Sequence, residues 1–243
     1  MQNNSKYLIK NLFSIKKKVY LITGSEGGMG KEIVRLIRIN GGVAVCIDKI
    51  NLKSSKNIYY RVDLSKKSEI LDFSKKIKKK YNKFDGIINL AGISDSKNFE
   101  KNFQVNIFSV YYLIKSLHTL IDQQGCSIIN ITSLNSELGF SNNPGYNSSK
   151  GALKMLTKSM ALDLAKYNIR VNNVGPGYIK TKMTQKSFKN KIEKNKRIKR
   201  TLLNKYGDVK DLFGIILYLI SDSSSYVTGQ DFYVDGGFLA KGI

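Results

Sequence analysis

An apolar segment that runs into a cluster of glycines constrains the fold of this chain more than any other feature. Residues 18–23 are rich in β-branched and aromatic side chains, which favour a strand, and they lead directly into a turn with four glycines between positions 24 and 30. Residues 32–37 then repeat apolar side chains with helical periodicity. The order of strand, glycine turn and helix indicates a parallel α/β fold that binds a dinucleotide.

The glycine turn and the next strand suit a dinucleotide for physical reasons. Glycine lets the backbone approach a pyrophosphate closely, and the following helix offers free N–H groups and the positive end of its dipole. A second apolar strand, 43–47, ends in Asp48, eighteen residues after Gly30. An acidic side chain there can accept hydrogen bonds from the adenosine ribose and repel a 2′-phosphate, so NAD(H) is favoured over NADP(H). Taken singly, these features also fit an ordinary βα turn or a solvated strand end.

A second pattern, in the middle of the chain, favours redox chemistry on a carbonyl or an alcohol. Tyr146 and Lys150 are four residues apart, so they share one face of a helix, and Ser133 closes an apolar strand thirteen residues before Tyr146. A fixed ammonium favours a phenolate, so we expect Lys150 to lower the pKa of Tyr146. The serine hydroxyl can bind the substrate oxygen that the tyrosine protonates. For the pair alone, an exposed tyrosine and lysine on an amphipathic helix is the alternative.

The rest of the chain alternates strands with helices. We expect strands near 19–23, 43–48, 58–62, 86–89, 127–132, 169–174 and 230–234, and helices near 29–39, 66–80, 99–122, 146–167 and 208–221. This alternation predicts an α/β fold, a Rossmann-type doubly wound sheet of seven parallel strands with helices on both faces. The chain has 243 residues, 42% of them hydrophobic, enough for a single catalytic domain over 12–243 after a flexible segment, 1–11.

Together these motifs resemble the short-chain dehydrogenase/reductase family, in its compact single-domain branch. Residues 23–30 match the family's cofactor motif TGxxxGxG, residues 89–92 correspond to its NNAG motif, and residues 170–177 match the strand and Pro-Gly turn beside the nicotinamide. The resemblance covers about residues 12–240. Within the family, residues 201–208 and the carboxyl-terminal end look most similar to 3-oxoacyl-carrier-protein reductases and gluconate-type sugar dehydrogenases, a pattern that bacterial surface-sugar enzymes share.

The resemblance implies a set of functional residues. The catalytic residues it implies are Asn106, Ser133, Tyr146 and Lys150, with Asn106 holding a water that links the lysine to bulk solvent. The cofactor-binding residues it implies are Gly24, Ser25, Gly28, Met29, Gly30, Asp48, Asp63, Leu64, Asn89, Ala91, Gly92, Tyr146, Lys150, Pro176, Gly177, Ile179 and Thr181. It also implies a mobile substrate lid near 178–205, after the Pro-Gly turn.

The chain departs from the family pattern at three points. Leu90 replaces the second asparagine of NNAG, which weakens one contact in the sheet without touching the chemistry. Only thirteen residues separate Gly92 from Asn106, fewer than the family usually has, so one wall of the substrate mouth is expected to be lower. Residues 24–30 also fit TGxxGxxG, the signature of a longer, sugar-nucleotide-modifying branch, but 243 residues leave no room for that branch's additional domain.

The chain is strongly basic, with 41 Lys and Arg against 18 Asp and Glu and a net charge of +23. Such an excess can mark a nucleic-acid or anionic-membrane binder. The lysine clusters fall on presumed solvent faces of helices without interleaved aromatic side chains, so neither partner is expected. Twelve basic residues lie between Lys180 and Lys210, over the expected lid, and would attract an anionic substrate. A lid that only shares the composition of the whole chain is the alternative.

Other features bear on location and assembly. Cys46 and Cys126 form no CxxC pair, which is typical of reduced thiols in a cytoplasmic enzyme, and His118 has no ligand cluster around it, so no metal is expected. No signal-peptide pattern and no membrane-length apolar stretch is present. The helices expected at 99–122 and 146–167 correspond to those through which the family commonly forms tetramers. The second is apolar on more than one side, so we expect a homotetramer or at least a dimer.

The sequence therefore predicts an NAD-dependent oxidoreductase that transfers hydride between nicotinamide and a carbonyl or secondary alcohol. The substrate is expected to be a small molecule, with a 3-oxoacyl thioester and a keto-sugar or sugar acid as candidates. A non-catalytic dinucleotide- or nucleic-acid-binding protein on the same fold is the alternative. The presence of all four catalytic residues argues against it, since a binding protein has no need of them.

Overall fold

The seven strands of the protein form one parallel sheet. The computed structural model describes residues 11–50, 58–121, 125–181, 184–185 and 190–241, and within them the strand order is β3-β2-β1-β4-β5-β6-β7. The strands are β1 (Val19–Thr23), β2 (Val43–Asp48), β3 (Ile58–Arg61), β4 (Gly86–Asn89), β5 (Cys126–Ile131), β6 (Ile169–Pro176) and β7 (Asp231–Val234). The strands β2 and β3 follow β1 on one side, and the strands from β4 onward lie on the other side. Open α/β sheets bind ligands at the point where the strand order switches sides, here between β1 and β4.

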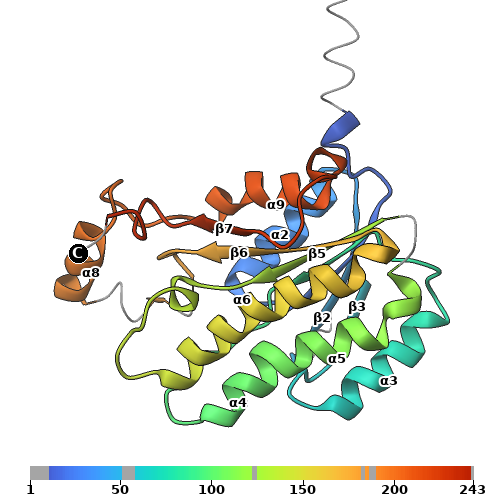
Figure 1. Cartoon of the computed structure of the whole chain (residues 1–243), viewed down its shortest axis with the longest axis horizontal. Helices are drawn as coiled ribbons and strands as arrows, with labels where there is room; N and C mark the ends of the chain where they lie inside the picture. Colours follow the sequence, from blue (N-terminus) through green and yellow to red (C-terminus); the bar gives the residue numbers. More distant parts are fainter. Residues whose placement is uncertain (1–10, 51–57, 122–124, 182–183, 186–189, 242–243) are drawn as a thin grey trace, which may run out of the picture.

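Helices cover both faces of this sheet (Figure 1). On one face lie α2 (Gly28–Ile39) and α9 (Phe213–Ile220); on the other lie α3 (Lys67–Lys78), α5 (Ser109–Ser116) and α6 (Pro144–Leu164). Neighbouring residues of a strand point to opposite faces, so Leu21 of β1 packs toward α3 and α5 while Ile22 packs toward α2 and α9. Burial on both sides is the reason that the central strands β1, β2 and β4 are almost continuously apolar. The predicted doubly wound fold is confirmed.

Two helical segments differ from the prediction. The helix expected at 99–122 is divided into α4 (Phe99–Phe103), a π-helical turn η1 (Gln104–Phe108), α5 and a short 3₁₀ turn, while residue 122 lies outside the described part. A π-helical turn is rare and frequently marks a functional site. The second difference is α8 (Lys191–Lys199), which the sequence did not predict because its only apolar side chains, Ile192 and Ile198, show no helical repeat. Of the flexible segment expected at 1–11, only residue 11 is described.

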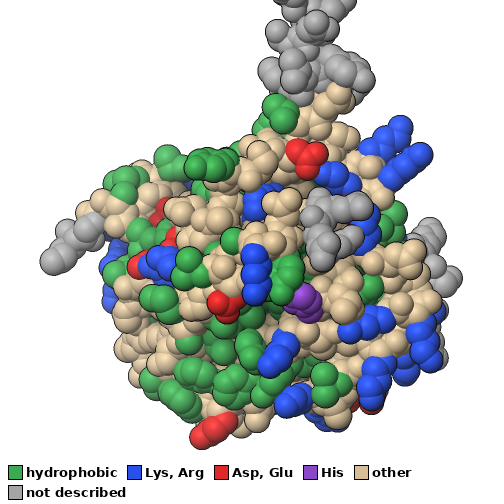
Figure 2. Space-filling view, turned by 45° about the vertical axis from the view of Figure 1, so that its right-hand side comes forward, with side chains coloured by type: hydrophobic (Ala, Val, Ile, Leu, Met, Phe, Trp, Pro, Cys, Tyr) green, Lys and Arg blue, Asp and Glu red, His purple; other side chains and the backbone are tan. Residues whose placement is uncertain are grey.

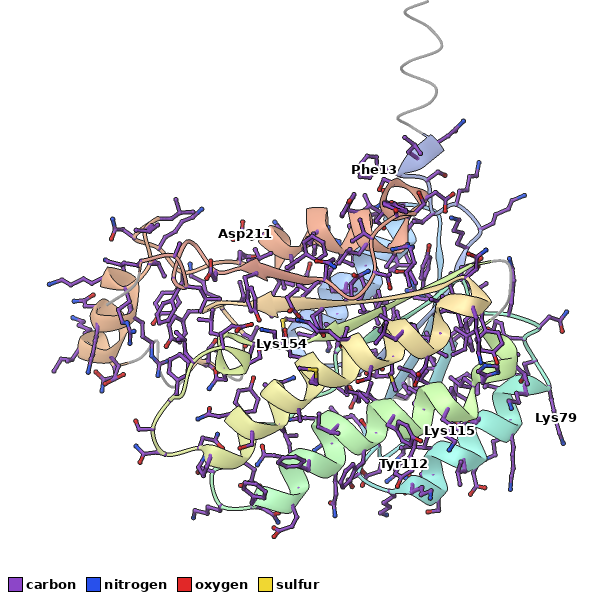
Figure 3. The ribbon with its side chains drawn as sticks, viewed as in Figure 1. Phe13, Lys79, Tyr112, Lys115, Lys154 and Asp211 are labelled. Carbon is purple, nitrogen blue, oxygen red and sulfur yellow. The ribbon has the colours of Figure 1, made fainter. Side chains whose placement is uncertain are left out.

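Buried side-chain hydrogen bonds fix α6 on the sheet. Asn89 of β4 donates to Asn130 of β5 at 2.8 Å, and Asn130 donates to Thr157 of α6 at 2.7 Å. The Thr157 hydroxyl also lies 2.6 Å from the amide oxygen of Asn173 on β6. Lys154, labelled in Figure 3, extends from the preceding turn of α6 toward the edge of the sheet. A connected network of buried hydrogen bonds fixes α6 in one position on the sheet. Apolar contacts alone fix the position of a helix less precisely.

The surface carries the excess of positive charge. In Figure 2, Lys and Arg side chains are spread over the visible face between apolar and neutral ones.

His118 packs edge-to-face on Tyr167, with 4.6 Å between ring centres. In the described residues we find no group of three His, Cys, Asp or Glu side chains that could hold a metal ion. A search of the same residues for a helix long and apolar enough to cross a membrane also finds none.

Candidate active site

The glycine turn forms a cradle at the carboxyl end of β1. Gly24 has φ +64°, and a Cβ atom on it would lie 2.8 Å from the backbone of Ala91. A Cβ atom on Gly30 would lie 2.1 Å from the carbonyl oxygen of Gly24, so the turn closes only with glycine at both positions. Helix α2 then starts after Gly27, whose lack of a side chain leaves the first N–H groups of the helix open. These residues therefore fit the pyrophosphate of a dinucleotide.

The acidic residue at the end of β2 lies beside this turn. Asp48 is buried, and its carboxylate accepts hydrogen bonds from the backbone N–H groups of Glu26 at 2.9 Å and Ile50 at 3.3 Å. Ser25 is also buried, with its backbone N–H donating to the carbonyl of Ile47 at 3.4 Å. The glycine turn and the end of β2 are thus hydrogen-bonded to each other, and the carboxylate is held where an adenosine ribose would lie in a dinucleotide-binding fold.

Asp63 and Leu64 follow β3 and have different environments. One carboxylate oxygen of Asp63 accepts hydrogen bonds from the backbone and the hydroxyl of Ser65, at 3.0 and 2.7 Å. Burial raises the pKa of Asp63, but these hydrogen bonds outweigh it and leave the pKa below its ordinary value. The Leu64 side chain is buried in the core under α3, so only its backbone remains for contact with a cofactor.

A cleft of about 320 Å³ lies at the carboxyl ends of β4, β5 and β6, a volume within the usual range of small-molecule sites. Of the predicted site residues, the cleft is lined by Met29, Gly92, Ser133, Tyr146, Lys150, Pro176, Gly177, Ile179 and Thr181. The others lie outside its lining: Gly24, Ser25, Gly28, Gly30, Asp48, Asp63, Leu64, Asn89, Ala91 and Asn106. The structure thus brings the proposed nicotinamide end and the catalytic set into one cleft, with the glycine turn next to it.

Tyr146 enters the cleft from the first turn of α6. Asn143 caps this helix by accepting a hydrogen bond from the Tyr146 backbone at 3.3 Å, and Pro144 occupies the first helical position. Burial raises the pKa of the Tyr146 phenol, and a hydrogen bond with Ser133 lowers it in part. The expectation that Lys150 lowers this pKa is therefore wrong, because desolvation dominates. The phenol keeps its proton at neutral pH.

Lys150 lies one turn further along α6. Its ammonium donates a hydrogen bond of 2.7 Å to the carbonyl of Ile131 at the end of β5, and its Nζ atom lies 5.7 Å from the centre of the Tyr146 ring. The side chain is only 4% exposed, and burial lowers the pKa of Lys150 to about 8. A lysine with this pKa can gain or lose a proton close to neutral pH, which an ordinary lysine cannot.

Asn106 sits in the middle of the π-helical turn η1. Its amide oxygen accepts from the backbone of Ile93 at 2.9 Å, and its amide nitrogen lies 2.9 Å from the hydroxyl of Ser149 on α6. A Cβ atom on Gly92 would lie 3.4 Å from the Asn106 amide oxygen and 3.5 Å from the Lys150 ammonium. Because position 92 is glycine, the space between Asn106 and Lys150 stays open.

The structure also places residues in the cleft that the sequence prediction missed. They are Leu90, Ser94, Ile131, Thr132, Leu134, Asn135, Phe140, Ser141, Asn143, Tyr178, Thr184 and Arg197. Most come from the loop after β4, the segment that follows Ser133 and the described residues between positions 178 and 197. No motif distinguishes them in the sequence, because the fold alone brings them together.

The fold and the cleft define a class of protein. A dinucleotide cradle stands beside a cleft where a buried tyrosine, a serine hydroxyl and a lysine of lowered pKa meet, an arrangement suited to proton transfer at a carbonyl or alcohol oxygen. A dinucleotide can supply or accept the hydride at the same carbon. The class is therefore that of nicotinamide-dependent oxidoreductases.

Comparison with known proteins gives the family. A family model described as "Enoyl-(Acyl carrier protein) reductase" matches residues 28–239. The chain is 32% identical to a 2-dehydro-3-deoxy-D-gluconate 5-dehydrogenase of Formosa agariphila, over 95% of this chain and 96% of that protein. It is 32% identical to a 3-oxoacyl-[acyl-carrier-protein] reductase of Buchnera aphidicola, over 92% and 98%. A solved gluconate 5-dehydrogenase of Burkholderia cenocepacia, in complex with NADP and tartrate, is 26% identical with a TM-score of 0.90, over 96% and 99%.

The chain belongs to the short-chain dehydrogenase/reductase family. It is an oxidoreductase that uses a nicotinamide dinucleotide and acts on CH–OH or C=O groups. The resemblance seen in the sequence and the predicted class of reaction are both confirmed.

Proposed function

We propose that the protein interconverts the keto group of a small sugar acid and the corresponding secondary alcohol. The observation that carries this proposal is the polar wall of the cleft. Hydroxyl- and amide-bearing side chains lie around the catalytic set, among them Ser94, Asn135, Ser141, Asn143 and Thr184. Several of these groups already bond to one another or to the backbone, and a polyhydroxylated substrate can add further hydrogen bonds to them, whereas an acyl chain adds none. The names of the Formosa and Burkholderia proteins are consistent with this substrate class.

The cleft residues divide the proton chemistry among them. In the reductive direction, Tyr146 donates its phenolic proton to the substrate oxygen, and the raised pKa keeps that proton in place until negative charge develops. Ser133 donates a hydrogen bond to the same oxygen. The nicotinamide, when bound, supplies the hydride. Lys150 lies behind the tyrosine and exchanges protons near pH 8, and the open space beside Gly92 accommodates a water between Asn106 and Lys150.

NAD(H) is the proposed cofactor. The buried Asp48 carboxylate at the end of β2 would face the 2′-phosphate of NADP with like charge. Glu26, in the glycine turn, adds a second carboxylate beside it, paired with Lys31 at 3.1 Å. The contrary feature is the basic Lys49 next to Asp48. The Burkholderia structure contains NADP, so the preference is a proposal about this chain alone.

We also propose that the protein is cytoplasmic and forms a homotetramer or a dimer. Each subunit is a single domain with a substrate lid over 178–205. Support for assembly comes from large apolar side chains that remain exposed on α4 through α6. Phe99 and Phe108 are each 48% exposed, Met155 is 61% exposed and Leu162 is 81% exposed. Apolar side chains in this number on neighbouring helices are typical of a surface that another subunit covers. Light scattering that gave a monomer mass at micromolar concentration would contradict the assembly.

Steady-state kinetics with purified enzyme test the function. NADH oxidation is measured with 5-keto-D-gluconate, a neutral keto-sugar and an acetoacetyl thioester, and NAD+ reduction is measured with 2-dehydro-3-deoxy-D-gluconate, which a 5-dehydrogenase oxidises at its C5 hydroxyl. We expect the largest kcat/KM for one of the two sugar acids. A larger value for the thioester would instead support the second candidate, a 3-oxoacyl reductase, which the similarity to the Buchnera protein and the apolar Leu134 and Phe140 in the cleft wall favour.

A further inference from the structure

Charge is distributed unevenly around the cleft. Among the described residues that line it, only Lys150 and Arg197 carry a charge, and no carboxylate does. Lys150 is buried and donates to the end of β5. Arg197 belongs to α8, whose other basic residues do not line the cleft. Within the described part of the chain, the positive charge available to a substrate at the open side of the cleft is therefore that of Arg197.

The Arg197 guanidinium is held in place before any substrate binds. Its Cζ atom lies 4.9 Å from the centre of the Tyr178 ring, which also lines the cleft. Its Nε atom lies 3.7 Å from a carboxylate oxygen of Glu193, one turn earlier on α8, and the guanidinium interacts with the phenol of Tyr206. A guanidinium has five N–H donors in a planar fork, and these contacts leave donors for a ligand. Fixing the side chain in advance lowers the entropy cost of binding.

A second arginine of the same helix provides an internal comparison. The Cζ atom of Arg200 lies 4.7 Å from the centre of the Phe238 ring, and Phe238 contacts Tyr178 edge-to-face with 5.5 Å between ring centres. Both arginines thus stack on aromatic rings that hold α8 against the body of the protein. Arg200 does not line the cleft, so the two residues share the anchoring contact and differ in access to the substrate.

From this arrangement we infer that Arg197 binds the carboxylate of the substrate and makes the enzyme selective for the acid over its neutral analogue. This inference rests on the proposed function. A keto-sugar acid carries its carboxylate several bonds away from the keto carbon, so the keto oxygen can reach Tyr146 while the carboxylate meets the outer wall formed by α8. A planar carboxylate matches the guanidinium fork with two parallel hydrogen bonds.

The test compares 5-keto-D-gluconate with its amide, which has the same shape without the charge. NADH-dependent kinetics are measured for the wild type and for R197Q, R197K and R200Q. For R197Q we expect kcat/KM for the acid to fall roughly 10- to 100-fold, mainly through KM, because hydrogen bonds to charged groups are worth about 1.5–3 kcal/mol. For the amide, kcat/KM should change by no more than about twofold, which is well below the tenfold change that corresponds to 1.4 kcal/mol. R197K should retain part of the preference for the acid, since it keeps the charge without the fork.

The R200Q variant separates recognition from anchoring of the helix. It loses an equivalent stacking contact, so we expect an unchanged ratio between acid and amide. Equal losses for acid and amide in R197Q, with no recovery in R197K, would overturn the inference and leave the proposed function standing. Wild-type enzyme that turned over thioesters but neither acid nor amide would refute the proposed function, and the carboxylate role would fall with it.

Discussion

The two walls of the cleft differ in what holds their functional side chains. On the side of β5 and α6, Tyr146 and Lys150 are fixed by a capped helix, a buried polar network and the end of a strand. On the side of α8, Arg197 is held by the ring of Tyr178 and by Glu193 on the same helix. In the proposed mechanism, the first wall performs the reaction and the second binds the part of the substrate that differs between family members. Because the catalytic residues and the residues that select the substrate lie on separate walls, substitutions on the less firmly held wall can alter selectivity without altering the reaction.

The largest expected effect tests the chemical wall. Tyr146→Phe keeps the ring and removes the proton donor, so turnover should fall by at least roughly 10²- to 10⁴-fold, the usual contribution of general acid/base catalysis. NADH affinity, measured by fluorescence titration, should change little. Tyr226→Phe is the matched control, because Tyr226 is fully exposed and does not line the cleft. Near-normal turnover of the Tyr146 variant would remove the basis for assigning the catalytic role to α6.

The second prediction compares Lys150, which is buried beside Tyr146, with Lys196, which is exposed on α8. The pKa of Lys150 is about 8 in the folded protein and about 10.4 in an unfolded chain, so burial of the charge costs stability below pH 8. This cost is relieved as pH rises from 8 to 10.4, where the unfolded state binds more protons. The stability of Lys150→Met relative to wild type should therefore fall between pH 7 and pH 10, by at most about 3 kcal/mol, since one pKa unit is worth about 1.4 kcal/mol.

Thermal unfolding at several pH values measures this difference. Lys196→Met is the control, because it removes the same charge from an exposed position on α8. Its stability relative to wild type should stay within about 0.5 kcal/mol across the same range. A parallel pH response of the two variants would show that burial does not set the behaviour of Lys150.

The third prediction concerns the turn that supports the cofactor. A Cβ atom on Gly30 would lie 2.1 Å from a backbone oxygen, so Gly30→Ala forces the turn open at a cost of roughly 1–3 kcal/mol and should weaken NADH binding about tenfold or more. Gly214→Ala is the control in α9, where a Cβ atom meets nothing within 4 Å and alanine should stabilise the helix by about 0.5–1 kcal/mol. Calorimetric titration with NADH and thermal unfolding distinguish the two variants.

The same contrast between the walls explains what could be read from the sequence. The strands, the glycine turn and the pair on α6 were predictable because each depends on local requirements, such as an apolar run, a backbone that excludes Cβ or a helical spacing. The π-helical turn at Asn106 was missed because it shares its apolar pattern with an ordinary helix. Arg197 looked like any other basic residue of the lid segment, since only the tertiary contact with Tyr178 sets it apart. The pKa of Tyr146 was misjudged because burial has no signature in spacing.

The smallest expected effect concerns the choice between NADH and NADPH. Asp48 should favour NADH, and the basic Lys49 next to it acts in the opposite direction. The Asp48 carboxylate accepts hydrogen bonds from two backbone N–H groups and lies beside the position that the 2′-phosphate of NADP would occupy. The wild type should therefore prefer NADH over NADPH in kcat/KM by about tenfold, or 1.4 kcal/mol. Asp48→Ser should narrow this preference, and Glu26→Gln should narrow it less, because Lys31 already neutralises that carboxylate. Lys49→Ala should widen it if the lysine turns toward the phosphate and leave it unchanged if the side chain stays in solvent. A wild-type preference for NADPH of tenfold or more would show that the basic residues around β2 outweigh Asp48, and the carboxylate would then serve only to hold the glycine turn.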